Sequence, residues 1–267
     1  MFYWFRDFLP SPELLQFAGW SIYWYGFLIV LAMASCLLVI SYLARINNLD
    51  KTKILDLFFY LVIFGVLGAR LYYVFFYNLD YYLGHPLDIL KIWQGGLAIH
   101  GGVAAGLLTG YFFIKKNNLV LAKYLDILAV ALPLGQAIGR WGNYFNQELF
   151  GKPCQLPWCI AIDLDHRPAV YQSFQYFHPV FLYESLLNLG LFCLLFWGYK
   201  IKKWRPGSAI IIYLIGYSVI RFLTEFLRID VIQTHWGLKW VQWLCLLVIG
   251  VCCFYFFFFW RKKSGQL

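Results

Sequence analysis

The chain has 267 residues, of which 62% are apolar, 22% aromatic and only 13% charged. A soluble globular domain carries about 25% charged residues, so this chain has too little polar surface for a soluble enzyme. The formal net charge of +9 would suit either a nucleic acid or an anionic membrane surface. The mean hydropathy of +0.65 favours the membrane, and the composition predicts an all-α, polytopic membrane protein with no nucleic-acid partner.

Seven apolar stretches are long enough to cross a bilayer, which takes roughly 17–25 residues. The fourth stretch is the weakest candidate because it carries Lys123, Asp126 and Pro133. The helix count would change by one if that stretch did not cross. We expect transmembrane helices over residues 20–44, 54–77, 96–114, 121–139, 179–199, 208–227 and 239–260.

Short basic clusters follow the first, third, fifth and seventh stretches, which places them all on one side of the membrane. Lys and Arg gather in cytoplasmic loops, so we expect the N-terminus outside and the C-terminus inside. The segment 140–178 then faces outward, as a small cap within a single integral-membrane domain covering 1–267. The clusters are Arg45/Lys51/Lys53, Lys115/Lys116/Lys123, Lys200/Lys202/Lys203/Arg205 and Arg261/Lys262/Lys263. The aromatic segment at 2–8 resembles an interfacial anchor.

The cysteines and histidines show no metal-binding pattern. Five of the seven cysteines lie in apolar stretches, where they are expected to pack as small apolar side chains. Cys154 and Cys159 flank an outward loop, where both the free and the disulfide-bonded forms stay open. No HExxH or CxxC spacing, Walker loop, GxSxG or dinucleotide fingerprint occurs. We therefore expect no metal and no cofactor.

Charged residues inside the sixth stretch call for a reason, because a charge at the bilayer centre costs about 2.5–3.5 kcal/mol. Arg221, Glu225 and Arg228 recur at helical spacing on one face, one turn after Tyr217. They could form a structural ion pair within the helix. However, Glu225 can neutralise only one arginine, which leaves a positive charge for an external anion.

The stretch from Gly139 to Gly151, at the end of the fourth helix, combines three glycines with Arg140, Asn143 and Glu148. Arginine and carboxamide groups suit an anion, because they offer planar, multidentate hydrogen bonds. A helix C-cap with an arginine reaching to the interface is the simpler alternative. It accounts for one glycine and the arginine, but leaves the carboxamides and the glutamate without a role.

Three further polar residues lie within or next to the apolar stretches, with Arg70 the deepest in its helix. His100 precedes two glycines, and either a packing role or a chemical role is open to it. Arg70 follows Gly68, and a structural role is favoured for it. His178 precedes Pro179 and marks the start of the fifth helix. His100 together with Arg140, Arg221 and Arg228 predicts a site for a small anion at the outer leaflet, such as a phospholipid headgroup.

The segment Gly139-Arg-Trp-Gly-Asn-Tyr-Phe-Asn-Gln-Glu-Leu-Phe-Gly151 resembles the signature of the bacterial phosphatidylglycerol:prolipoprotein diacylglyceryl transferases. Further segments agree with that family in order: Trp24-Tyr-Gly26, Gly68-Ala-Arg70, His100-Gly-Gly102, His178-Pro with Leu182-Tyr-Glu184, and Arg221-Phe with Glu225 and Arg228. One departure is Gln242, which follows valine where the family often has a Gly-Gln pair. The Cys154/Cys159 pair is also not expected of the family.

The resemblance implies a transferase in the bacterial cytoplasmic (inner) membrane, with a site open to the outer leaflet. Such an enzyme moves the diacylglyceryl group of phosphatidylglycerol to the lipobox cysteine of a prolipoprotein signal peptide. A thioether forms and glycerol phosphate leaves. Expected catalytic residues are Arg140, Arg221 and His100. Expected phosphatidylglycerol-binding residues are Arg140, Asn143, Glu148, Gly151, Tyr25, Tyr217, Arg228 and Glu225.

Two points of this reading stay open. His100 could be the base that takes the thiol proton, or it could only position lipid while the arginine field lowers the thiol pKa. Other functions that the composition allows are a lipid-binding transporter or channel, a lipid transferase with another acceptor, and a rhodopsin-like receptor. The apolar inner halves of the helices argue against a transport pathway, and the seventh stretch lacks a central lysine for retinal.

Overall fold

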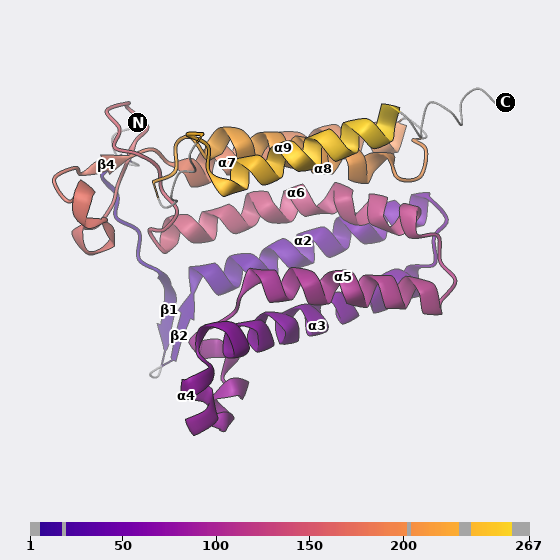
Figure 1. The fold of residues 1–267 in the computed structure, drawn as a ribbon, viewed down its shortest axis with the longest axis horizontal. Coiled ribbons are helices and arrows are strands. Elements are labelled where there is room, and N and C mark those ends of the chain that lie inside the picture. Colours follow the sequence, from indigo (N-terminus) through magenta and orange to yellow (C-terminus); the bar gives the residue numbers. More distant parts are fainter. Residues whose placement is uncertain (1–5, 18–19, 202–203, 230–235, 258–267) are drawn as a thin grey trace. The chain divides into compact units, whose positions relative to one another are not determined.

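A computed structural model describes residues 6–17, 20–201, 204–229 and 236–257. The described chain is almost entirely helical (Figure 1). It divides into two compact units, one formed by 1–39 with 126–267 and the other by 40–125. The element bounds are β1 Glu13–Phe17, β2 Trp20–Tyr23, α2 Trp24–Ile46, α3 Lys51–Tyr77, α4 Leu79–Gly84, α5 Ile99–Lys116, α6 Leu121–Phe145, β3 Ile160–Ala161, β4 Tyr176–Phe177, α7 Val180–Ile201, α8 Ser208–Thr224 and α9 Trp240–Tyr255.

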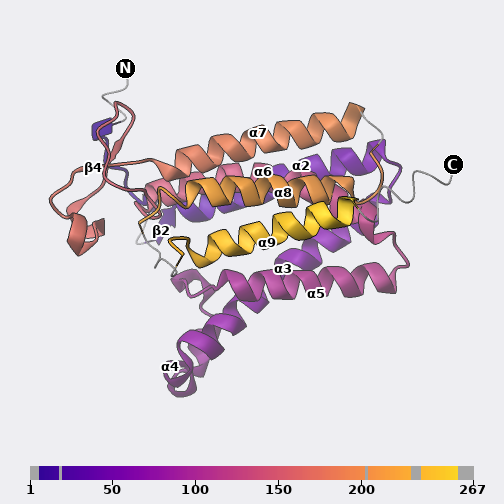
Figure 2. The same cartoon turned by 45° about the horizontal axis from the view of Figure 1, so that its top comes forward.

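In the first unit, α6 contacts helices on more than one side. Its small residues let α2 come close, since a Cβ on Gly135 would lie 2.8 Å from Cys36 Sγ. On another side, Ser185 Oγ of α7 donates a hydrogen bond of 2.8 Å to the carbonyl of Ala137. Helix α8 packs against both α7 and α9, and the three run side by side (Figure 2). Helix α6, the most polar of the long helices, is therefore in contact with the apolar helices α2 and α7.

The segment 146–178 forms a small layer at the ends of α6 and α7. Strands β3 and β4 pair antiparallel, with Ile160 opposite Phe177. Both side chains are buried with Tyr144 of α6 and Phe181 of α7. Cys154 and Cys159 form a disulfide across a Cα–Cα distance of 5.9 Å, which settles the form that the sequence left open.

In the second unit, α3 and α5 pack through glycines. A Cβ on Gly68 would lie 2.7 Å from the carbonyl oxygen of Gly101, so a side chain there would push the two backbones apart. Arg70 is buried one half-turn further on and donates hydrogen bonds to the backbone carbonyls of Asp88, Ile89, Gly95 and Gly96, at 2.6–3.0 Å. The structural role favoured for Arg70 is confirmed.

All seven predicted stretches fall on helices. Four helices are long and apolar enough to cross a membrane, namely α2, α3, α6 and α7. Helices α8 and α9 are apolar but shorter, and α5 has 18 residues. The described chain is thus a helical membrane protein, while the count of seven crossings stays a prediction. The predictions on residues 2–5, 202–203 and 261–263 lie outside the described residues.

Candidate active site

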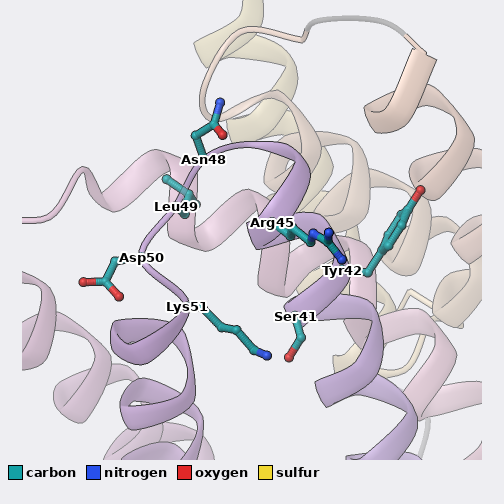
Figure 3. A pocket seen from close by; sticks show the side chains of 7 residues that line it. All are labelled: Ser41, Tyr42, Arg45, Asn48, Leu49, Asp50 and Lys51. Atoms are coloured by element: carbon teal, nitrogen blue, oxygen red, sulfur yellow. The ribbon is translucent and has the colours of Figure 1, made fainter.

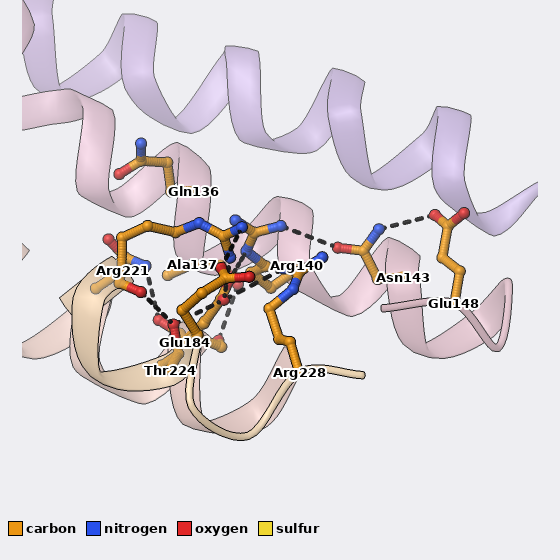
Figure 4. A network of polar contacts seen from close by, with 12 residues as sticks. Gln136, Ala137, Arg140, Asn143, Glu148, Glu184, Arg221, Thr224 and Arg228 are labelled. Carbon is orange, nitrogen blue, oxygen red and sulfur yellow. Dashed lines mark hydrogen bonds and ion pairs between the residues drawn. The ribbon is translucent and has the colours of Figure 1, made fainter. Parts of the chain in front are cut away.

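Three arginines of the first unit converge on one buried carboxylate, Glu184 of α7 (Figure 4). Arg140 Nε of α6 forms an ion pair with Glu184 Oε2. Arg221 Nη1 of α8 lies 3.2 Å from Oε1, and Arg228 Nη1, beyond α8, lies 3.6 Å from the same oxygen. Thr224 Oγ1 donates a further hydrogen bond to Oε1 at 3.1 Å. Glu184 of α7 therefore links α6, α8 and the segment that follows α8.

A second carboxylate, Glu225, extends this arginine cluster toward α9. Arg221 Nη2 lies 2.7 Å from Glu225 Oε2, and Lys239 Nζ lies 3.4 Å from Oε1. Lys239 Nζ also donates to the carbonyl of Arg228 at 2.6 Å. Arg221 and Glu225 thus form an ion pair within one stretch, which the sequence left open. The arginine expected to lack a carboxylate is also paired, because Arg228 lies beside Glu184. Among the described residues, four basic side chains are thus linked to two carboxylates.

Two arginine side chains of the cluster are more exposed to solvent than its two carboxylates. The side chains of Arg140 and Arg221 are 21% and 16% exposed, whereas those of Glu184 and Glu225 are 3% and 0% exposed. Arg228 is 5% exposed. An anion that approached the cluster would therefore meet guanidinium groups rather than carboxylates. Burial of the carboxylates strengthens their hold on the arginines, because the local dielectric is low.

Arg140 is also held from the other direction by the predicted carboxamide and glutamate. Its Nη1 donates to Asn143 Oδ1 at 3.4 Å, and Asn143 Nδ2 donates to Glu148 Oε1 at 2.8 Å (Figure 4). The chain leaves α6 through Gln147 and Leu149, both with positive φ near 50°. This sharp exit brings Glu148 back beside the helix end, which a continued helix would not do.

Gly151 places the segment after α6 against the segment after α8. It forms an antiparallel β-bridge with Arg228, and its N–H donates to the carbonyl of His178 at 2.9 Å. A Cβ there would lie 2.8 Å from His178 Cβ and 3.1 Å from the carbonyl oxygen of Leu227. The structure thus gives Gly151 a positioning role for the cluster, and its predicted contact with lipid stays a prediction.

The two predicted tyrosines flank the cluster along their helices. The ring of Tyr25 lies against Gly142, two residues after Arg140, where a Cβ would come within 2.6 Å of it. Tyr217 stacks on Tyr213 with a centroid distance of 5.9 Å. The Tyr213 hydroxyl accepts a hydrogen bond from Gln136 Nε2 of α6 at 2.9 Å. Both Tyr25 and Tyr217 therefore belong to the same unit as the arginines.

His100 belongs to the second unit, in the first turn of α5. Its ring lies 5.9 Å from that of Tyr72, and the residue is exposed. Its role as a base stays a prediction. His178 instead lies in the first unit, before α7, with Nδ1 at 3.2 Å from the Tyr183 hydroxyl. That placement confirms the structural role predicted for His178.

The described residues include no group of three or more His, Cys, Asp or Glu side chains that could hold a metal ion. A pocket of about 690 Å³ lies at the corner between α2 and α3, in the second unit. Figure 3 shows Ser41, Arg45 and Lys51 directed toward one space, with the Asp50 carboxylate turned away. Asp50 instead caps α3 through the N–H groups of Thr52 and Lys53. No predicted site residue lines this pocket.

Glu184 enters the sequence-based prediction only as part of the family resemblance and is left out of the predicted site. A signal existed, because Glu184 is the one acidic residue in the apolar run 180–201 and a charge at that depth needs a partner. Lys239 was assigned to the edge of the last helix, yet it is 6% exposed and paired. Its partner is more than ten residues away in the chain, so spacing gave no signal for it.

Comparison with known proteins identifies the family of the chain. A family model described as prolipoprotein diacylglyceryl transferase matches residues 12–258. The chain belongs to this family. The match includes every predicted site residue, from Tyr25 to Arg228.

Similar bacterial proteins carry the name phosphatidylglycerol–prolipoprotein diacylglyceryl transferase. One from Synechococcus sp. (strain CC9902) is 46% identical over 226 residues, covering 83% of this chain and 80% of the relative. One from Gloeobacter violaceus is 42% identical over 223 residues, covering 83% and 82%. One from Thermotoga maritima is 42% identical over 226 residues, covering 84% and 76%. The prolipoprotein diacylglyceryl transferase family is therefore the one that the resemblance had indicated.

Proposed function

We propose that this family member transfers the diacylglyceryl group of phosphatidylglycerol to the lipobox cysteine of a prolipoprotein, and that its arginine cluster holds the phosphate. Family membership supports the reaction, since the relatives are named for phosphatidylglycerol and prolipoprotein. The phosphate site is proposed because the side chains of Arg140 and Arg221 are partly exposed, whereas Glu184, which pairs with both, is buried. The proposed diacylglyceryl transfer is the first step of bacterial lipoprotein maturation.

The charge change in this reaction suits an arginine clamp. The cysteine sulfur attacks a glycerol carbon, the C–S bond forms, and the C–O bond to phosphate breaks. The phosphodiester carries −1, whereas the departing phosphate monoester carries about −1.5 to −2. Fixed positive charge therefore stabilises the transition state more than the bound substrate, which is the condition for catalysis. Glu184 and Asn143 keep the two faces of Arg140 oriented, so little reorganisation is needed.

The thiol must lose its proton during the attack. Its ordinary pKa is about 8.5, so a base or a positive field is required near neutral pH. In this proposal His100 takes the proton, as an imidazole does at physiological pH. Phosphatidylglycerol contacts are assigned to Asn143, Glu148, Gly151, Tyr25, Tyr217, Glu225 and Arg228 beside the clamp.

The same proposal sets the protein in the cytoplasmic (inner) membrane, with seven crossings, N-out and C-in. The two units act as one integral-membrane domain, and 140–178 caps its outer end. Support comes from basic residues in the last turns of α2, α5 and α7, such as Arg45, Lys115 and Lys200. Both substrates then reach the site laterally from the bilayer and its outer leaflet.

The experiment measures glycerol phosphate release and peptide lipidation by purified protein, phosphatidylglycerol and a lipobox peptide in detergent. Arg140→Ala and Arg221→Ala should each lower release by at least about a hundredfold, as loss of a transition-state donor does. Arg45→Ala, an exposed arginine outside the cluster, is the matched control and should retain activity. A Cys→Ala peptide is the blank.

Arg140→Lys keeps the charge and serves as the check on folding. It cannot make the two-sided contacts to Glu184 and Asn143, so release should still fall. Full activity in a folded Arg140→Ala protein would contradict the clamp. If the wild-type protein bound lipid but released no glycerol phosphate, the result would favour a lipid-binding protein without this chemistry.

A further inference from the structure

A groove of about 610 Å³ lies between α3 and α5, within the second unit. Most of its wall is aromatic or aliphatic, including Tyr60, Phe64 and Phe112. One end is polar, with Lys53 in the first turn of α3 and Lys116 in the last turn of α5. None of the predicted site residues lines it. The groove thus has the two-part chemistry of an amphiphile, apolar along its length and cationic at one end.

The length of the groove matches one leaflet of a bilayer. Lys53 and Phe64 are eleven residues apart on α3, which corresponds to about 16 Å at 1.5 Å per residue. The hydrocarbon core of a bilayer is about 30 Å thick, so one leaflet contributes about 15 Å. An acyl chain in the groove would therefore run from the headgroup level at Lys53 to about the bilayer centre.

The polar end favours an anion. Lys53 Nζ donates to Asn117 Oδ1 at 2.8 Å, which holds the ammonium group at the groove mouth. Lys116 lies opposite on α5. Its neighbour Lys115 does not line the groove and instead lies over the Tyr111 ring, at 5.8 Å. Asp56 is the one carboxylate among the described lining residues. The two lining lysines, Lys53 and Lys116, therefore outweigh the single acidic group of the groove.

We propose that the groove between α3 and α5 is a binding site for an anionic phospholipid, with its phosphate at Lys53 and Lys116 and an acyl chain along Tyr60, Phe64 and Phe112. The lipid comes from the leaflet at the basic end of the helices. That this leaflet is the cytoplasmic one rests on the proposed orientation. The groove shares no residue with the arginine cluster, since its lining residues lie within 53–117 and those of the cluster within 140–239.

The experiment counts bound lipids on the purified full-length protein by native mass spectrometry. Phosphatidic acid is the probe, because it is anionic and lacks the glycerol headgroup that the transferase reaction releases; phosphatidylcholine is the zwitterionic comparison. Lys53→Gln with Lys116→Gln should weaken phosphatidic acid binding by on the order of tenfold to thirtyfold, at the usual contribution of each lysine near an anionic lipid. Phosphatidylcholine binding should change little.

Matched variants assign the effect to the groove. Lys115→Gln with Lys200→Gln removes the same charge from residues that do not line it, and should change binding at most about threefold. Asp56→Asn should strengthen phosphatidic acid binding about fivefold, because it removes the opposing carboxylate. This opposite shift keeps the test decisive even where the double lysine variant does not fold.

Equal phosphatidic acid binding in all variants, or no preference over phosphatidylcholine in the wild-type protein, would overturn the proposal. Glycerol phosphate release is measured on the same samples. It should persist in the groove variants, whose residues take no part in the proposed chemistry. If the wild-type protein released no glycerol phosphate, the proposed function would be contradicted. The number of bound lipids, and hence this inference, would not be affected.

Discussion

Glu184 determines how the site residues lie with respect to one another. An arginine buried at membrane depth has few positions open to it, and a carboxylate fixes one by charge and by geometry. Glu184 does this for Arg140, Arg221 and Arg228. The three arginines were predicted from sequence because each stood out in an apolar helix. Their common partner was not assigned, because it lies about 40 residues from either of its helical partners.

Glu184→Gln tests this role directly. The change keeps the shape of the side chain but removes the charge that the three arginines share. Loss of one partner from a buried ion pair costs about 3–5 kcal/mol, so both the melting temperature and glycerol phosphate release should fall. The control is Glu13→Gln, an exposed residue, which should change neither. An unchanged melting temperature for Glu184→Gln would refute the role.

His178 gives a pH-dependent prediction. Burial lowers the pKa of His178 below its ordinary value of 6.5. The unfolded chain therefore takes up this proton at a higher pH than the folded protein, so stability falls as pH drops below about 6.5. Thermal melting between pH 7.5 and 5 should show a smaller loss in His178→Gln than in wild type. His166→Gln, on an exposed part of the cap, should retain the wild-type slope.

Helices α3 and α5 owe their close approach to glycine. Their contact includes Gly68 on one helix and Gly101 on the other, where either Cβ would collide with the opposing backbone. Without side chains at these points the backbones pack directly, as small residues allow in membrane helices. This contact also sets the position of His100, the residue before Gly101. Sequence showed the glycines as part of a motif but could not show which helix each one meets.

Gly68→Ala should destabilise the protein by about 1–3 kcal/mol, the usual cost of overpacking. Gly110→Ala on α5 is the matched control, since its Cβ would lie 3.9 Å from Leu61 Cδ2 in ordinary contact. That change should be neutral or stabilising, because alanine favours a helix by about 1 kcal/mol over glycine. Thermal melting in detergent compares the two. Similar melting temperatures for both variants would contradict the close contact.

On the scale of the whole molecule, helices of both units end in basic residues. Arg45, Lys115 with Lys116, and Lys200 lie in the last turns of α2, α5 and α7. The disulfide between Cys154 and Cys159 lies in the cap, as expected for an oxidising compartment. Both features favour the proposed orientation, in which the cap faces away from the cytoplasm.

Cysteine labelling measures that orientation. Asp165→Cys places a thiol on an exposed part of the cap, and Lys116→Cys places one at the basic end. The five free cysteines are replaced by alanine in both. In intact spheroplasts a membrane-impermeant maleimide should label the first and spare the second, and lysis should make both reactive. Labelling of Lys116→Cys before lysis would reverse the proposed topology.

The sequence by itself determined the protein class, the helix positions and most of the candidate site. Apolar runs of spanning length report helices without tertiary information, because lipid excludes unpaired backbone groups. Polar residues in apolar helices need a reason, because burying them in the bilayer is costly. This reason and the family resemblance together pointed to Arg140, Asn143, Glu148 and Arg221.

The tertiary structure alone decided which charges pair. Glu184 as the common partner, Lys239 as a partner of Glu225, and the disulfide of the cap all join residues through space. A helical pattern places residues on a face, but the facing helix and its register follow from packing of the whole bundle. Ion pairs act over a few ångströms, so they are fixed only once that packing has brought their partners together.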